Sequence, residues 1–299
     1  MFDVRLTPQG AFDNHARDCH YMTATPIAAA MGAEISGVDV RTISDAALIE
    51  FCDALYRHKM VFVQGQSLTH AEHEAFSARL GPFGTDAYTH GVRDHPNVQP
   101  VIKEADTRTN ALFGGSWHTD SAFLEQPPSI STLYSIEIPP FGGDTAWANC
   151  ALAYRMLTPA MQAMLAPLRV HMSAAANYAT QVRVNGAAVP FASDDAGQRA
   201  IDGEFHPLVR THPETGEKSL YVDESYAIGI EGMTAQESRP LLDFLARHIT
   251  QHAFTCRLRW SPNMLVLWDN RVTIHHASND YDGYRREMYR TTIQGEIPA

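Results

Sequence analysis

The sequence predicts a mainly β protein with flanking helices, whose core is a closed or sandwiched β structure of the jelly-roll type. Two observations lead to this expectation. The second half of the chain holds many short runs of β-forming residues between turns, and the helical patterns are amphipathic, as expected for helices packed outside a sheet. With 299 residues and a hydrophobic fraction of 44%, the chain fits one domain over residues 1–299, with residues 1–25 as a polar, mobile start.

In the first half, apolar periodicity and capping residues delimit four elements. They are a strand within Gly32–Val40, an amphipathic helix after Ser44, a buried strand over Met60–Gln64, and a helix opened by the capping box of Thr69 and Glu72 and ended by Gly81-Pro82.

In the second half, turn residues separate further helices and strands. The helices are expected near Trp147, after Thr158-Pro159 and after the Thr234–Glu237 capping box; the strands are expected at Pro207–Thr211 and Ser219–Asp223 (a hairpin), Phe254–Trp260, Met264–Trp268 and Glu287–Ile293.

The charge and the absence of targeting signals exclude several classes of protein. Lys and Arg number 23 against 34 Asp and Glu, which gives a net charge of −11 and predicts no nucleic-acid partner. No apolar stretch approaches the ~18 residues of a membrane span, and the N-terminus lacks the pattern of a signal peptide. The four cysteines lie far apart, so we expect them to be reduced and the protein to be cytoplasmic.

The segment Trp117–Asp120 holds the sharpest candidate for chemistry. On an extended segment, His118 and Asp120 point to the same side, so both could bind one metal ion. A distant histidine would complete the two-histidine, one-carboxylate set that leaves positions open on iron(II). The triplet alone is weak, because a buried histidine beside a surface aspartate gives the same pattern. Similar His-x-Glu triplets start at His70 and His212.

Near the C-terminus, a second group of histidines and arginines falls on predicted strands. His275 and His276 are adjacent and must face opposite ways, so only one can enter a site. Arg286 and Arg290 are four residues apart, which places both on the same side of a strand. Buried guanidiniums require anions, although a solvated basic face would explain the pair equally well.

Together these motifs resemble the taurine/2,4-dichlorophenoxyacetate dioxygenase (TauD/TfdA) family, whose members use iron(II) and 2-oxoglutarate. The similar stretches occur in the family's order and span most of the chain. They are WHTD at Trp117–Asp120, GGDTAWAN at Gly142–Asn149, WDNRVTIH at Trp268–His275 and the terminal RREMYRTTIQGE. The stretch HPLVRTHPETGEKSLYVD looks like the aryloxyalkanoate-degrading branch.

The resemblance implies a distorted jelly roll (double-stranded β-helix) and a residue set for each ligand. It implies iron(II) at His118, Asp120 and His275, the last in preference to His276. It places Thr145 and Arg286 on the 2-oxoglutarate carboxylate, with Arg290 facing an anionic substrate. Molecular oxygen is then the second cosubstrate, and a homo-oligomer, either dimer or tetramer, is expected.

Around the expected substrate site, the chain departs from the taurine enzymes. Asp86 stands where they carry histidine and Gly114 where they carry asparagine, whereas the aromatic residue is kept as Tyr226. The expected substrate-binding set consists of Arg290, Gly114, Tyr226 and Ser121. The departures favour a less polar anion, an aryloxyalkanoate-like carboxylate cleaved at its ether bond, with an alkyl sulfate or sulfonate as the alternative.

Two other classes of function remain possible alternatives. His248 and His252 lie four residues apart on a predicted helix, as in zinc hydrolases, but the intervening Ile-Thr-Gln lacks the glutamate that would act as general base. A non-catalytic binding protein on the same scaffold is the third class, because a fold does not fix a function.

Overall fold

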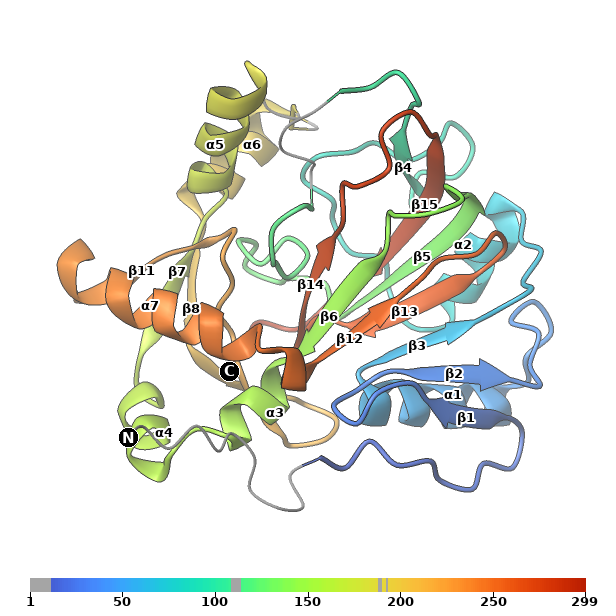
Figure 1. Cartoon of the computed structure of the whole chain (residues 1–299), viewed down its shortest axis with the longest axis horizontal. Helices are drawn as coiled ribbons and strands as arrows, with labels where there is room; N and C mark the ends of the chain where they lie inside the picture. The colour runs from blue at the N-terminus through green and yellow to red at the C-terminus, as the bar shows by residue number, and fades with distance from the viewer. Residues whose placement is uncertain (1–11, 109–113, 188–189, 192) are drawn as a thin grey trace.

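Two β sheets pack against each other at the centre of the protein (Figure 1). The computed structural model describes residues 12–108, 114–187, 190–191 and 193–299. The large sheet has the order β1-β2-β3-β13-β5-β15-β4. Its strands are β1 Thr23–Pro26, β2 Ala33–Ser36, β3 Met60–Val63, β13 Leu265–Asp269, β5 Ile130–Glu137, β15 Arg286–Ile293 and β4 Gln99–Lys103.

The small sheet, of order β12-β6-β14, closes one side of the core. It consists of β12 Thr255–Leu258, β6 Thr145–Asn149 and β14 Thr273–Ala277. Trp147 of β6 and Trp268 of β13 belong to one apolar cluster, with ring centroids 5.9 Å apart, so the two sheets share a core.

The central strands of the large sheet are buried on both faces. On β13, Val266 and Trp268 join the core between the sheets, whereas Leu265 and Leu267 join a second cluster on the other face. Side chains alternate along a strand, so an unbroken apolar run is what a strand covered on both sides requires. The apolar run Met60–Val63 of β3 has the same explanation.

Capped helices cover the outer face of the large sheet. Helix α1 (Asp45–His58) contacts β3 and β13, and α2 (His70–Ala78) contacts β15. The Ser44 side chain accepts from the Ala47 amide, and Thr69 forms the capping box with Glu72, as the sequence predicts.

The remaining elements lie beside the small sheet, on the left in the view of Figure 1, with α5 and α6 at the top and α4 at the bottom. They comprise a sheet of order β11-β7-β8, the predicted hairpin β9-β10 and several helices. Their bounds are α3 Cys150–Arg155, α4 Pro159–Leu165, β7 Arg169–Met172, α5 Ala175–Asn185, α6 Asp194–Asp202, β8 Glu204–Pro207, β9 Val209–Thr211, β10 Lys218–Leu220, β11 Ala227–Ile230, α7 Ala235–Ile249 and the 3-10 turn η1 His252–Phe254.

Two expectations about helices are wrong. Trp147 does not begin a helix: it lies in β6, paired with Cys256 and His275, and the helix begins at Cys150 after the Asn149 cap. Pairing on both sides and complete burial outweigh the local pattern. His252 does not extend α7, which ends at Ile249, so it does not share a helix with His248.

Three further expectations concern the whole chain. Within the described residues no helix is long and apolar enough to cross a membrane. All four cysteines, which lie in the described part, are free thiols. Of the N-terminal segment expected to be mobile, residues 1–11 lie outside the described residues, and residues 23–26 form β1.

Candidate active site

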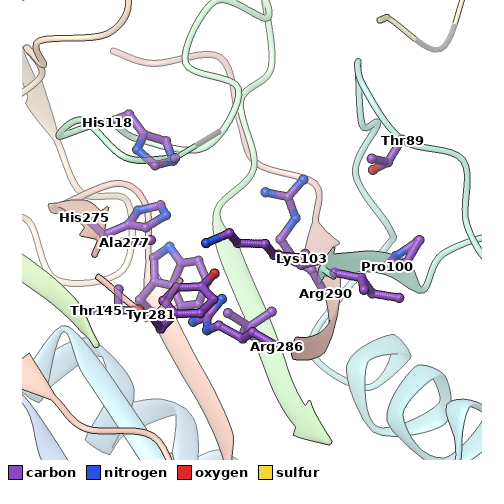
Figure 2. Close-up of a pocket in the computed structure, with 15 residues that line it drawn as sticks. Thr89, Pro100, Lys103, His118, Thr145, His275, Ala277, Tyr281, Arg286 and Arg290 are labelled. Carbon is purple, nitrogen blue, oxygen red and sulfur yellow. The ribbon is translucent and has the colours of Figure 1, made fainter. Parts of the chain in front are cut away.

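His118, Asp120 and His275 converge beside the core between the sheets. His118 and His275 form an antiparallel backbone bridge, with N–H···O distances of 3.0 and 2.8 Å. The Nε2 atom of each histidine lies 3.9 Å from Asp120 Oδ1. All three potential ligand atoms lie within 4.8 Å of one another, the only such group among the described residues. Figure 2 shows the two imidazoles facing each other at the edge of a pocket.

Hydrogen bonds orient two of these side chains. His118 Nδ1 donates to the carbonyl oxygen of Ser116 at 2.8 Å, which leaves the Nε2 lone pair free toward Asp120. The Ser131 hydroxyl donates to Asp120 Oδ2 at 2.6 Å, and Oδ1 is therefore the oxygen that faces the histidines. Between the two ligands, Thr119 Oγ1 donates to the Thr273 carbonyl oxygen at 3.0 Å and ties the segment to β14.

Burial lowers the pKa values of the two histidines, and charged neighbours lower that of Asp120. Burial lowers the pKa of His118, and it lowers that of His275 to about 3, so both imidazoles are neutral. Burial alone would raise the pKa of Asp120, but Arg290 and the two histidines outweigh it and bring the value to about 2. Two neutral imidazoles and one carboxylate are the donor set that suits iron(II), with positions left open.

Next to these ligands lies a largely apolar cavity with cationic groups at one end (Figure 2). Its apolar wall includes Pro100, Val101, Ile102 and Leu133, and its polar wall includes Thr145, Tyr281, Lys103, Arg286 and Arg290. Arg286 and Arg290 line this cavity from the same strand, so the even spacing on β15 does bring both to one side.

Among the described residues, Arg286 is a buried cation without a carboxylate partner, and its guanidinium carbon lies 5.6 Å from the centroid of the Trp260 ring. Arg286 is 5% exposed, and its Nε and Nη2 atoms have no hydrogen-bond acceptor among the described residues. Burial lowers its pKa. Nearby, Thr145 Oγ1 accepts from Trp260 Nε1 at 3.0 Å, so the threonine proton is free to donate to a further oxygen. A cavity with an unpaired guanidinium and a free hydroxyl fits a carboxylate that is not part of the protein.

Arg290, by contrast, already has acidic partners. Its Nη1 atom donates to Asp120 Oδ1 at 2.9 Å, and Nη2 donates to Asp86 Oδ2. Burial would lower its pKa, but the two carboxylates outweigh it and raise it. Only its Nε atom has no partner in the described part of the chain.

Of the other residues expected to bind the substrate, one lines the cavity and two do not. Gly114 lines the cavity at φ +78°, and a Cβ there would lie 3.4 Å from the His118 ring. Tyr226 and Ser121 are buried but are not among the described residues that line this cavity. The ring of Tyr226 lies behind His118, with centroids 6.2 Å apart, and packs edge-on against Phe123.

Sequence reasoning missed three contributors to the site. Ser131 and Trp260 act on Asp120 and Thr145 through contacts between distant segments, and no local pattern marks them. Lys103 lines the cavity, where its Nζ atom lies 4.3 Å from the centroid of the Tyr281 ring. Lys103 had a detectable signal: with Gln99 it forms an evenly spaced buried polar pair on β4.

The His248 and His276 side chains serve other contacts. His248 Nε2 bonds to the Ala153 carbonyl at 2.8 Å, which anchors α7 to α3. His276 is half-buried, and its ring lies 5.6 Å from that of Trp117. Neither belongs to a group of metal-ligating side chains in the described structure.

A β sandwich that holds two neutral imidazoles and a carboxylate beside a cavity lined by two arginines has the donor set of a mononuclear, non-haem iron(II) oxygenase. The family model for "Taurine catabolism dioxygenase TauD, TfdA family" matches residues 23–292. The chain belongs to this family, and it is an iron(II)- and 2-oxoglutarate-dependent dioxygenase.

Individual relatives are similar in sequence to this chain over nearly its whole length. A 2-oxoglutarate-dependent sulfate ester dioxygenase of Pseudomonas putida is 34% identical, over 92% of this chain and 90% of its own length. The 2,4-dichlorophenoxyacetate dioxygenase of Cupriavidus pinatubonensis is 30% identical, over 91% and 97%. The solved structure of a taurine dioxygenase from Burkholderia xenovorans has a TM-score of 0.78 at 35% identity, over 94% and 91%, and it confirms the predicted jelly-roll fold.

Proposed function

We propose that the protein hydroxylates a small organic anion at a carbon that carries an oxygen substituent. The observation that carries the proposal is the buried guanidinium of Arg286, two of whose donor atoms have no acceptor among the described residues, in the same cavity as the histidine ligands. When bound, iron(II) and 2-oxoglutarate supply the chemistry that uses O2 to hydroxylate a C–H bond, with release of succinate and CO2. Hydroxylation beside an ether or ester oxygen gives a product that loses that bond.

The proposed roles of the side chains follow from their contacts. His118, Asp120 and His275 would hold the metal, and the two histidines line the cavity. Arg286 and the Thr145 hydroxyl bind the distal carboxylate of 2-oxoglutarate. Its oxygens would accept hydrogen bonds from the Arg286 nitrogens that have no acceptor among the described residues and from the Thr145 hydroxyl.

Arg290 orients the anionic group of the substrate from the wall of the same cavity. It lines the wall and bonds to Asp120, which places its guanidinium close to the metal ligands. The apolar wall of Val101, Ile102 and Leu133 binds the rest of the substrate and excludes water. An anion with a compact apolar body, such as an aryloxyalkanoate, satisfies both parts of this surface.

A second substrate class, the alkyl sulfate esters, is favoured by the relative from Pseudomonas putida, whose name describes a sulfate ester dioxygenase. Sulfate esters share the required features, because an anionic group is joined through oxygen to an apolar carbon chain. Sulfonates lack that ester oxygen but offer the same kind of head group.

The test is substrate-dependent succinate release from 2-oxoglutarate by the iron-loaded protein. We expect release with phenoxyacetate, phenoxypropionate or alkyl sulfates, and loss of release in a His118→Ala variant. Release confined to sulfonates would exclude the proposal that the hydroxylated carbon carries an oxygen substituent. Absence of release with every anion in the panel would exclude these anions as the substrate class.

A further inference from the structure

Arg290 donates to the Asp86 carboxylate, whereas Arg286 has no carboxylate partner among the described residues. The Nη2 atom of Arg290 donates to Asp86 Oδ2, and its Nη1 donates to Asp120 Oδ1 at 2.9 Å. Asp120 is one of the three metal ligands, so Asp86 is the carboxylate that compensates the charge of Arg290. The guanidinium proposed to receive the substrate anion is therefore already neutralised by the protein itself.

Asp86 is held firmly in this position. Its Oδ1 atom accepts from the backbone amides of Tyr88 and Thr89, at 2.9 and 2.7 Å, and from Thr89 Oγ1 at 3.0 Å. Its side chain is 3% exposed. Thr89 itself lines the cavity, on the side to which the Arg290 guanidinium points (Figure 2). The carboxylate cannot leave Arg290 without breaking the hydrogen bonds that fold this loop.

An incoming anion thus meets a pair of opposite charges and not a free cation. The Nε atom of Arg290 has no acceptor in the described structure but is buried, so a substrate anion would meet Arg290 at the part of the guanidinium that lines the cavity, while Asp86 keeps Nη2. The anion then lies near a second negative charge in a largely apolar cavity. Like charges in such surroundings oppose binding, even when a shared cation lies between them.

We infer that Asp86 is a specificity-determining residue, which competes with the anionic group of the substrate for Arg290 and so lowers the preference of the pocket for anions. This inference rests on the proposed function, because it concerns the substrate end of the same cavity. Asp86 acts through Arg290 and not on the reacting carbon. The apolar wall then supplies a larger share of the binding free energy, and an uncharged analogue binds the natural protein almost as well as an anion does.

The experiment is calorimetric titration of the anaerobic protein loaded with iron(II) and 2-oxoglutarate, which measures binding without turnover. Phenoxyacetate and hexyl sulfate are each compared with an uncharged analogue, 2-phenoxyethanol and 1-hexanol. Asp86→Asn removes the charge but keeps an oxygen that accepts from the Tyr88 and Thr89 amides. We expect it to tighten binding of the anions by about tenfold or more, and to change binding of the uncharged analogues by less than about twofold.

Three variants serve as controls. Asp86→Glu keeps the charge, and Asp45→Asn makes the same change in net charge at the surface ion pair with Arg79. Both should keep the anion preference of the natural protein. Asp86→Ser is a second neutral variant, which should behave like Asp86→Asn and replaces it if that protein does not fold, as thermal unfolding will show.

The outcomes separate this inference from the proposed function. If the neutral variants bind the anions no more tightly, relative to the uncharged analogues, than the natural protein does, Asp86 does not set anion preference, and the proposed function stands. If neither the natural protein nor the neutral variants bind any of the anions, both the inference and the anionic substrate are wrong.

Discussion

At the scale of single residues, surroundings decide what identical side chains do. Arg286 and Arg290 lie on one strand and line one cavity. Arg286 has two donor atoms without acceptors in the described structure, whereas Arg290 donates to two carboxylates. The sequence could predict that both lie on the same side of the strand, because that follows from their even spacing. It could not predict their different partners, because Asp86 is 204 residues from Arg290 along the chain.

The adjacent histidines allow a matched test of the metal site. His275→Ala removes a ligand atom that lies 3.9 Å from Asp120 Oδ1, so we expect iron(II) binding to weaken by at least about tenfold. His276→Ala truncates a half-buried ring on the opposite side of the same strand and should retain iron(II) binding. Metal content after dialysis against iron(II) is the measurement. Equal metal content in the two variants would remove His275 from the ligand set.

At the scale of elements, local signals located the helices well and the site strands less well. The N-caps at Ser44, Thr69 and Thr234 are all present in the structure. These signals succeed because a cap involves residues three positions apart. The error at Trp147 has the opposite cause, since that residue is held by strand partners more than 100 positions away.

The cap of α7 provides a test of stability at this scale. The Thr234 hydroxyl accepts from the Glu237 amide, and the Glu237 carboxylate accepts from the Thr234 amide at 2.8 Å. Thr234→Ala should lower the free energy of unfolding by about 1 kcal/mol, measured by urea denaturation. Thr234→Ser keeps the hydroxyl and should cost less. A larger loss for serine than for alanine would show that the methyl group, not the cap, stabilises this helix end.

At the scale of the whole molecule, buried histidines link stability to pH. Burial lowers the pKa of His58 and His206 to about 4, and that of His73 and His275 to about 3. The ordinary histidine pKa is about 6.5 in an unfolded chain. Below that pH the unfolded state takes up protons that these histidines do not take up in the folded state, so their contribution to stability is complete above pH 6.5 and falls as the pH falls toward 4.

The corresponding prediction concerns the slope of stability against pH. Between pH 7 and pH 5, each of these histidines should remove on the order of 1–2 kcal/mol from the free energy of unfolding. His58→Gln keeps a polar partner for Asn14 and should flatten this slope, whereas His252→Gln, at an exposed position, should not. Urea denaturation at several pH values measures it. A slope in the His58→Gln variant equal to that of the natural protein would contradict the prediction.

The sequence by itself determined the class of fold, the N-terminal caps of four helices and the His118/Asp120 pair as candidate ligands, and its resemblance to the family pointed to His275. The caps and the pair depend on short spacings, which the covalent chain fixes. Only the tertiary structure decided that Ser131 orients Asp120, that Trp260 bonds to Thr145, and that Asp86 neutralises Arg290. Such contacts join segments that are far apart in the chain, and they exist only because burial between the two sheets brings polar groups together and requires each to find a partner.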